Sequence, residues 1–129
     1  HLGELFRARK RFKAALKEYL KAEAIAGDGH PAVQNGTAES LLALNRFNEV
    51  PKVLERVKFY YPRYLRTHLN LATAFLKLEQ DDNAITEFES AMSINPFHPG
   101  PHIALEKLYK RKGKSELVKR ARESLELLK

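Results

Sequence analysis

Polar side chains recur at helical intervals in the middle of the chain. Intervals of four, three and four residues separate Arg66, Asn70, Thr73 and Lys77. Such intervals place side chains along one face of an α-helix. A second basic group follows further along the chain: Lys107, Lys110 and Arg111. Guanidinium and ammonium groups form charge-assisted hydrogen bonds with carboxylates, so these residues favour the binding of an acidic group.

No arrangement of side chains favours catalysis or metal binding. Asp81 and Asp82 are adjacent, but neighbouring carboxylates at a predicted helix start far more often cap the helix than act as acid and base. His68 and His102 lie 34 residues apart and His98 lies near His102, yet no third metal ligand accompanies them. The chain also has no cysteine, no glycine-rich phosphate loop and no hydrolase motif. We therefore expect no catalytic residue, no metal and no cofactor.

A repeat with a period of 34 to 35 residues runs through the whole sequence. Its anchor is a small residue, found at Ala15, Val50, Ala84 and Val118. Large apolar residues stand nine positions before each anchor, at Phe6, Leu41, Phe75 and Tyr109. Within each copy apolar residues recur every three or four positions, which indicates helices rather than strands. We call the equivalent positions of the four copies a column. Several columns that recur with the same period indicate a repeated helical unit.

The third copy carries the fullest version of this pattern: Leu71-Ala72-Phe75-Ala84-Phe88-Ala91-Pro96. The first copy carries most of it: Leu2-Gly3-Phe6-Ala15-Tyr19-Ala22. The pattern resembles the tetratricopeptide repeat (TPR) family, whose helix-turn-helix unit has 34 residues. The resemblance implies an all-α fold, a right-handed α-solenoid of about four helix-turn-helix repeats. It also implies a protein-protein interaction scaffold that is not itself an enzyme.

We expect one domain, a single array over residues 1–129, with repeats at about 1–29, 30–62, 63–96 and 97–129. Helices are predicted at about 2–10, 12–26, 31–44, 47–60, 64–78, 81–94, 99–112 and 115–128. The first copy opens part-way into its first helix, and no initiator methionine precedes it. We therefore expect this chain to be a fragment of a longer protein.

The resemblance also implies where a ligand binds, because the first helices of successive TPR units line a concave groove. The face that carries Arg66 and Lys77 should look into this groove, and shifting it by the repeat length extends it to the neighbouring copies. The predicted groove residues are Asn35, Glu39, Arg66, Asn70, Thr73, Lys77, Lys107, Lys110 and Arg111. Small residues such as Gly36 should leave space for a ligand at the second-copy end. We expect an extended or helical peptide, acidic or ending in a carboxylate, from a partner or from another domain of the parent protein. The alternative is that these residues form ordinary solvated helix faces.

A carboxylate clamp of the kind by which some TPR modules hold the C-termini of heat-shock chaperones is not expected. If the second copy begins the clamp, Asn35 stands where Lys is required and Glu39 stands where Asn is required. Gly100 and Ala104 replace the required Lys and Arg, so that Asn70 alone agrees.

Three further features are candidates for partner binding. Four aromatic residues crowd into the stretch 59–64; Tyr60 is expected to close the core, which leaves Phe59, Tyr61 and Tyr64 as a possible surface patch. Basic clusters at 7–13 and 107–114 leave open a nucleic-acid-binding repeat array. The apolar residues Leu2 and Phe6 leave open a homo-oligomerisation module that uses the N-terminal edge.

Composition sets the remaining bounds. The formal net charge is +7, and most of the excess of basic residues lies near the two ends of the chain. No run approaches the roughly 20 apolar residues of a membrane span, and no signal peptide is visible. The absence of cysteine is compatible with reducing and oxidising compartments alike, so the sequence specifies no localisation.

Overall fold

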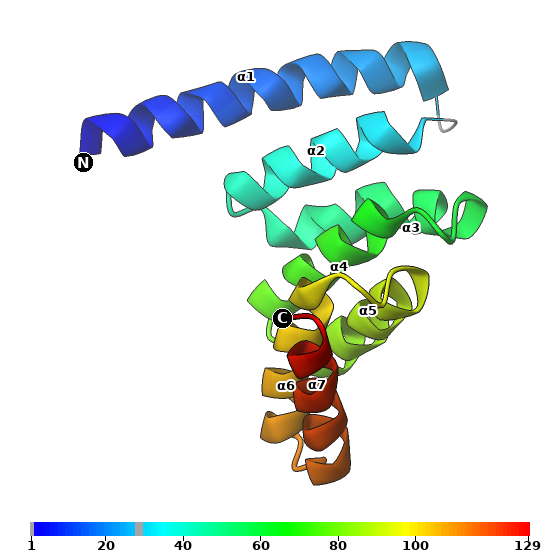
Figure 1. Cartoon of the computed structure of the whole chain (residues 1–129). Helices are drawn as coiled ribbons and strands as arrows, with labels where there is room; N and C mark the ends of the chain where they lie inside the picture. Colours follow the sequence, from blue (N-terminus) through cyan, green and yellow to red (C-terminus); the bar gives the residue numbers. More distant parts are fainter. Residues whose placement is uncertain (1, 28–29) are drawn as a thin grey trace.

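The computed structural model describes residues 2–27 and 30–129, which form a stack of helices without a β-strand. The helices are α1 (Leu2–Ala26), α2 (Pro31–Ala43), α3 (Val50–Tyr60), α4 (Leu65–Lys77), α5 (Asp81–Ile94), α6 (Pro99–Arg111) and α7 (Ser115–Leu127). A 3-10 turn, η2 (Phe47–Glu49), leads into α3. In Figure 1 the helices follow one another along the stack in chain order, from α1 at the top to α6 and α7 at the bottom. The predicted all-α solenoid is confirmed.

The apolar columns of the third copy form the centre of the core. Leu71 and Phe75 on α4 are buried, as are Ala84, Phe88 and Ala91 on α5. The alanines let the two helices approach each other, while the larger side chains fill the space between them. The repeat boundaries themselves stay predictions, and the one at residue 29 lies outside the described residues.

Three turns inside the repeats share one backbone geometry. Asn45, Glu79 and Gly113 have positive φ angles of 60°, 59° and 71°. In each turn the next amide donates to the carbonyl five residues before it, at N–O distances of 2.9, 2.8 and 2.9 Å. A residue in the left-handed backbone conformation, followed by this hydrogen bond, ends a helix and reverses the direction of the chain. The three turns lie 34 residues apart, so they set the period of the solenoid.

The first copy differs from the others because α1 runs without interruption from Leu2 to Ala26. The prediction of separate helices at about 2–10 and 12–26 is therefore wrong. Residues 8–16 contain neither glycine nor proline and are rich in Ala, Arg and Lys, which favour a continuous helix. Figure 1 shows the first half of α1 projecting beyond the end of α2. Leu2 and Phe6 are consequently 83% and 70% exposed.

An ion-pair network built around the buried Glu87 and His68 joins α3, α4 and α5. The Glu87 carboxylate lies 2.7 Å from Lys58 Nζ and 2.8 Å from His68 Nδ1. The other ring nitrogen of His68, Nε2, lies 2.6 Å from the carbonyl oxygen of Pro62. Both ring nitrogens face acceptors, which suits the imidazolium form because it donates from both. The hydrogen bond to Glu87 raises the pKa of His68, although burial opposes this shift.

The same histidine column recurs in the fourth copy with a structural role. Nε2 of His102 lies 2.8 Å from the carbonyl oxygen of Pro96, so both histidines bind the turn that precedes their own helix. Among the described residues, no group of three His, Cys, Asp or Glu side chains is placed to hold a metal. None of the described helices is long and apolar enough to cross a membrane.

We expect the free energy of unfolding to fall as the pH rises above about 6.5, the ordinary pKa of histidine. His68 has a raised pKa in the folded state, so its stabilising contribution is complete below that pH and is lost as the pH rises through the folded pKa. Urea unfolding at a series of pH values measures this slope. The His68→Gln variant should lack that part of it, and equal slopes in both proteins would contradict the imidazolium assignment.

Candidate peptide-binding surface

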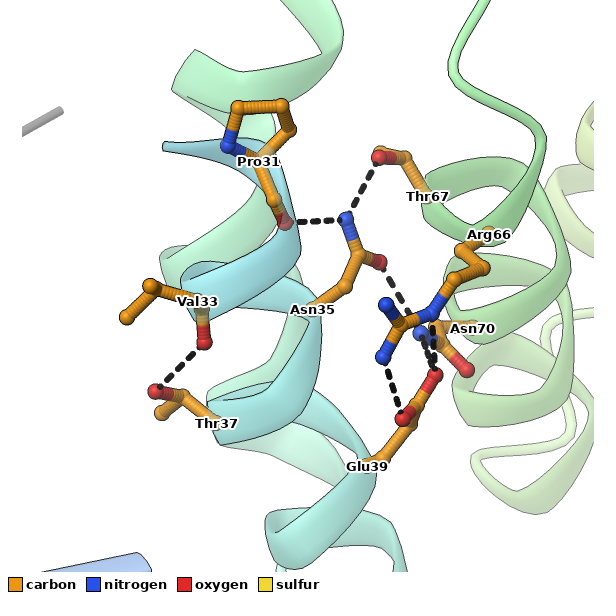
Figure 2. Close-up of polar contacts among 8 residues, drawn as sticks. All are labelled: Pro31, Val33, Asn35, Thr37, Glu39, Arg66, Thr67 and Asn70. Carbon is orange, nitrogen blue, oxygen red and sulfur yellow. Dashed lines mark hydrogen bonds and ion pairs between the residues drawn. The ribbon is translucent and has the colours of Figure 1, made fainter. Parts of the chain in front are cut away.

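Buried amides join the first helices of copies two and three. Asn35, fully buried on α2, donates from Nδ2 to the Pro31 carbonyl and to Thr67 Oγ1, both at 2.9 Å. Its Oδ1 accepts a hydrogen bond of 2.9 Å from Nδ2 of Asn70 on α4. Asn70 Nδ2 also donates to Glu39 Oε2 at 3.0 Å, and Figure 2 shows these side chains meeting between the two helices. Two predicted groove residues therefore fasten α2 to α4 from within.

Glu39 and Arg66 close the same side of the surface with a bidentate ion pair. The guanidinium donates from Nε to Glu39 Oε2 at 3.0 Å and from Nη2 to Oε1 at 2.6 Å. Partial burial favours the neutral carboxyl, but hydrogen bonds from Arg66 and Asn70 outweigh it and hold the pKa of Glu39 below its usual range. The hydrogen bond to Glu39 likewise raises the pKa of Arg66. The charge of Arg66 is thus already balanced inside the chain.

The space expected at the second-copy end is filled by α1. A Cβ atom placed on Gly36 would lie 2.3 Å from Cε1 of Tyr19, so the tyrosine ring rests directly on the glycine backbone. Gly36 is buried accordingly. The prediction of free space there is wrong, because the missing side chain of Gly36 admits α1 rather than a ligand.

A hollow of about 900 Å³ opens between α4 and α6. Its lining residues are Leu76, Lys77, Gly100, Ile103, Ala104, Lys107, Leu108, Lys110 and Arg111. Gly100 and Ala104 contribute little side-chain bulk, and the exposed Ile103 and half-buried Leu76 give the hollow an apolar surface. Four of the nine predicted groove residues meet here. Thr73 does not line the hollow, and its hydroxyl donates to the Leu69 carbonyl at 2.9 Å.

The rim of this hollow is basic. Lys77, Lys107 and Lys110 are exposed and form no ion pair with another described residue. Arg111 Nη2 lies 3.2 Å from Asp81 Oδ1 in an exposed pair. No aspartate or glutamate is among the described residues that line the hollow. An acidic group in the hollow would therefore meet three lysines that pair with no described residue, and the nearby Asp81 carboxylate, which pairs with Arg111, is not part of the lining.

The aromatic stretch lies elsewhere, at the end of α3. Tyr60 is 58% exposed and packs edge-on against the exposed Phe59, with ring centroids 5.1 Å apart. The expectation that Tyr60 closes the core is wrong, since Val57 is buried in its place one helical turn earlier. Tyr61 is also exposed and Tyr64 is half-buried. None of these aromatic residues lines the hollow between α4 and α6.

Replacing Asn35 by Leu should lower the free energy of unfolding by about 1–3 kcal/mol, because the buried polar groups of Thr67 and Asn70 would each lose one hydrogen bond. Urea unfolding measures the loss. Lys77→Ala is the matched control on α4, and as an exposed substitution it should change stability by no more than about 0.5 kcal/mol. Equal effects of the two substitutions would show that the amide network does not fasten α2 to α4.

Comparison with known proteins agrees with this architecture. The family model described as "Tetratricopeptide repeat" matches residues 65–98, which cover α4 and α5. No curated protein sequence matches the chain significantly. Among solved structures, the MamA RS-1 ArsTM double mutant superposes with a TM-score of 0.83 at 19% identity, covering 92% of this chain and 66% of that one.

Two further structures extend the comparison. MamA 41-end from Desulfovibrio magneticus RS-1 has a TM-score of 0.75 at 21% identity, covering 92% of this chain and 65% of its own. TTC0263, a thermophilic TPR protein of Thermus thermophilus, has a TM-score of 0.74 at 20% identity, covering 99% of this chain and 71% of its own. The chain spans less than two thirds of the length of the MamA double mutant and of MamA 41-end. It therefore contains a tetratricopeptide repeat and shares the solenoid fold of the tetratricopeptide repeat proteins.

Proposed function

We propose that this chain is a protein-interaction scaffold that binds an acidic peptide segment in the hollow between α4 and α6. The fold supports the general role, because TPR solenoids act as scaffolds for other proteins. The observation that carries the finer proposal is the lining of the hollow, in which an apolar surface carries four cations and no carboxylate. The peptide would come from a partner protein or from another domain of the parent protein.

The hollow offers two kinds of contact to such a peptide. An apolar side chain would pack against Leu76, Ile103 and Ala104, where small neighbours leave room for it. Carboxylates on either side of that anchor would reach the ammonium groups of Lys77 and Lys107. The apolar contact supplies affinity, and the charges speed the encounter and orient the segment.

The α2–α4 side of the surface is less suited to this ligand. A carboxylate that bound Arg66 would have to displace Glu39 from a bidentate pair and leave that carboxylate without its partner. Lys77 and Lys107 require no such exchange, because they form no ion pair with the described residues. The peptide should therefore be centred on α4 and α6.

A nucleic-acid-binding array is the competing possibility, and the placement of the basic clusters argues against it. Residues 7–13 lie on α1, whereas residues 107–114 lie at the end of α6 and in the turn before α7. Figure 1 places these segments at opposite ends of the stack. They do not form one basic track of the kind that follows a phosphate backbone.

Selection from a phage-displayed library of random peptides tests the proposal. The selected peptides should share Asp or Glu residues around one large apolar residue. Lys107→Glu should weaken the binding of a selected peptide roughly tenfold or more in fluorescence anisotropy, because it places a like charge beside the peptide carboxylates. Raising the salt concentration should also weaken binding.

Lys52→Glu provides the matched control, because it reverses an exposed charge on α3 outside the hollow. This variant should keep the wild-type affinity. Selected peptides without acidic residues, or equal losses in both variants, would overturn the proposal. Tight binding of a single-stranded oligonucleotide with a steep salt dependence would favour the competing function instead.

A further inference from the structure

The straight helix α1 occupies the place of a helix-turn-helix in the repeat. In copies two to four, a residue with positive φ stands four positions after the large apolar residue of the first helix. The pairs are Leu41 and Asn45, Phe75 and Glu79, and Tyr109 and Gly113. The same count from Phe6 leads to Lys10, which lies inside α1. Lys10 is therefore the position at which the first copy would turn.

Both sides of the missing hairpin are exposed in the straight helix. Leu2 and Phe6 share columns with Leu71 and Phe75, which are buried against α5 in the third copy. Tyr19, on the second half of α1, is 37% exposed, whereas its counterpart Phe88 is only 6% exposed. The exposed residues therefore fall in columns whose members are buried in the second and third copies, where the turn is formed.

We propose that α1 exchanges between this straight form and a hairpin that bends at Lys10, in which residues 2–9 fold back onto residues 13–24. The hairpin would bury Leu2 and Phe6 against Tyr19 and so complete a first repeat with the architecture of the other three. The occupant of the unpartnered apolar face of α1 is thus the second half of the same helix.

The straight form has two identifiable causes. Lys10 must adopt a positive φ in the hairpin, which costs more for lysine than for glycine, although Glu79 adopts the same conformation in copy three. The bend would also crowd the positive charges of Arg9, Lys10, Arg11 and Lys13 into one turn. A glycine at position 10 would remove the cost of the positive φ angle, and salt would weaken the repulsion between the positive charges.

Spin labels measure the exchange directly, since the chain has no cysteine of its own to be labelled. We would introduce Glu4→Cys and Lys21→Cys, two exposed positions on α1, and measure their separation by double electron–electron resonance. Seventeen helical residues place the two positions about 26 Å apart in the straight form. In the hairpin the two halves would lie side by side, with axes about 10 Å apart.

The wild-type chain should show both distances, and the shorter one should gain population as the salt concentration rises. Lys10→Gly should increase the short-distance population, while Lys10→Ala, the matched control, should keep α1 straight because alanine favours helix and disfavours positive φ. Phe6→Asp should remove the short distance by removing apolar surface that the hairpin buries.

Two results would overturn the proposal. One is a single long distance in the wild-type chain and in Lys10→Gly at every salt concentration. The other is a short distance that disappears when labelled chains are diluted with unlabelled ones, because that distance would join two copies rather than two halves of one helix. Far-UV circular dichroism of each variant confirms that the remaining helices stay folded.

Discussion

The left-handed turn is the constraint on which the rest of this solenoid depends. Where Asn45, Glu79 and Gly113 adopt positive φ, the following helix returns alongside the preceding one and the apolar columns close on each other. Where the chain continues straight, as in α1, the same kinds of side chain remain exposed. Whether the apolar residues of a copy are buried therefore depends first on the φ angle of one turn residue. Their size and shape matter once that turn has formed.

Buried polar groups fix the positions of neighbouring helices relative to each other, in addition to the apolar packing. His68 and His102 each hold the carbonyl of the proline-containing turn before their own helix, and Asn35 and Asn70 fix α2 against α4. Apolar side chains tolerate small shifts between neighbours, whereas hydrogen bonds that must all be formed in a buried site accept far fewer arrangements. These groups therefore fix how one copy sits on the next.

The features that follow from the periodicity of the sequence, such as the buried core positions, could be predicted. The features that depend on a single backbone dihedral angle, or on the distance between two helices, could not. The columns through Leu71, Phe75 and Phe88 correctly identified the core of the third copy. Nothing local distinguishes Lys10, which stays helical, from Glu79, which turns. Helical spacing grouped Lys77 with Arg66, but it could not reveal the pairing of Arg66 with Glu39, because that pairing depends on how closely α4 approaches α2.

The contrast between the two sides of α4 gives the solenoid uneven mechanical stiffness. Hydrogen bonds and a bidentate ion pair cross from α2 to α4, whereas a hollow of about 900 Å³ separates α4 from α6. A force that bends the stack should deform it where the fewest contacts must be broken, which is the α4–α6 side. The most easily deformed part of the stack therefore coincides with this hollow, so that bending the stack changes the width of the hollow.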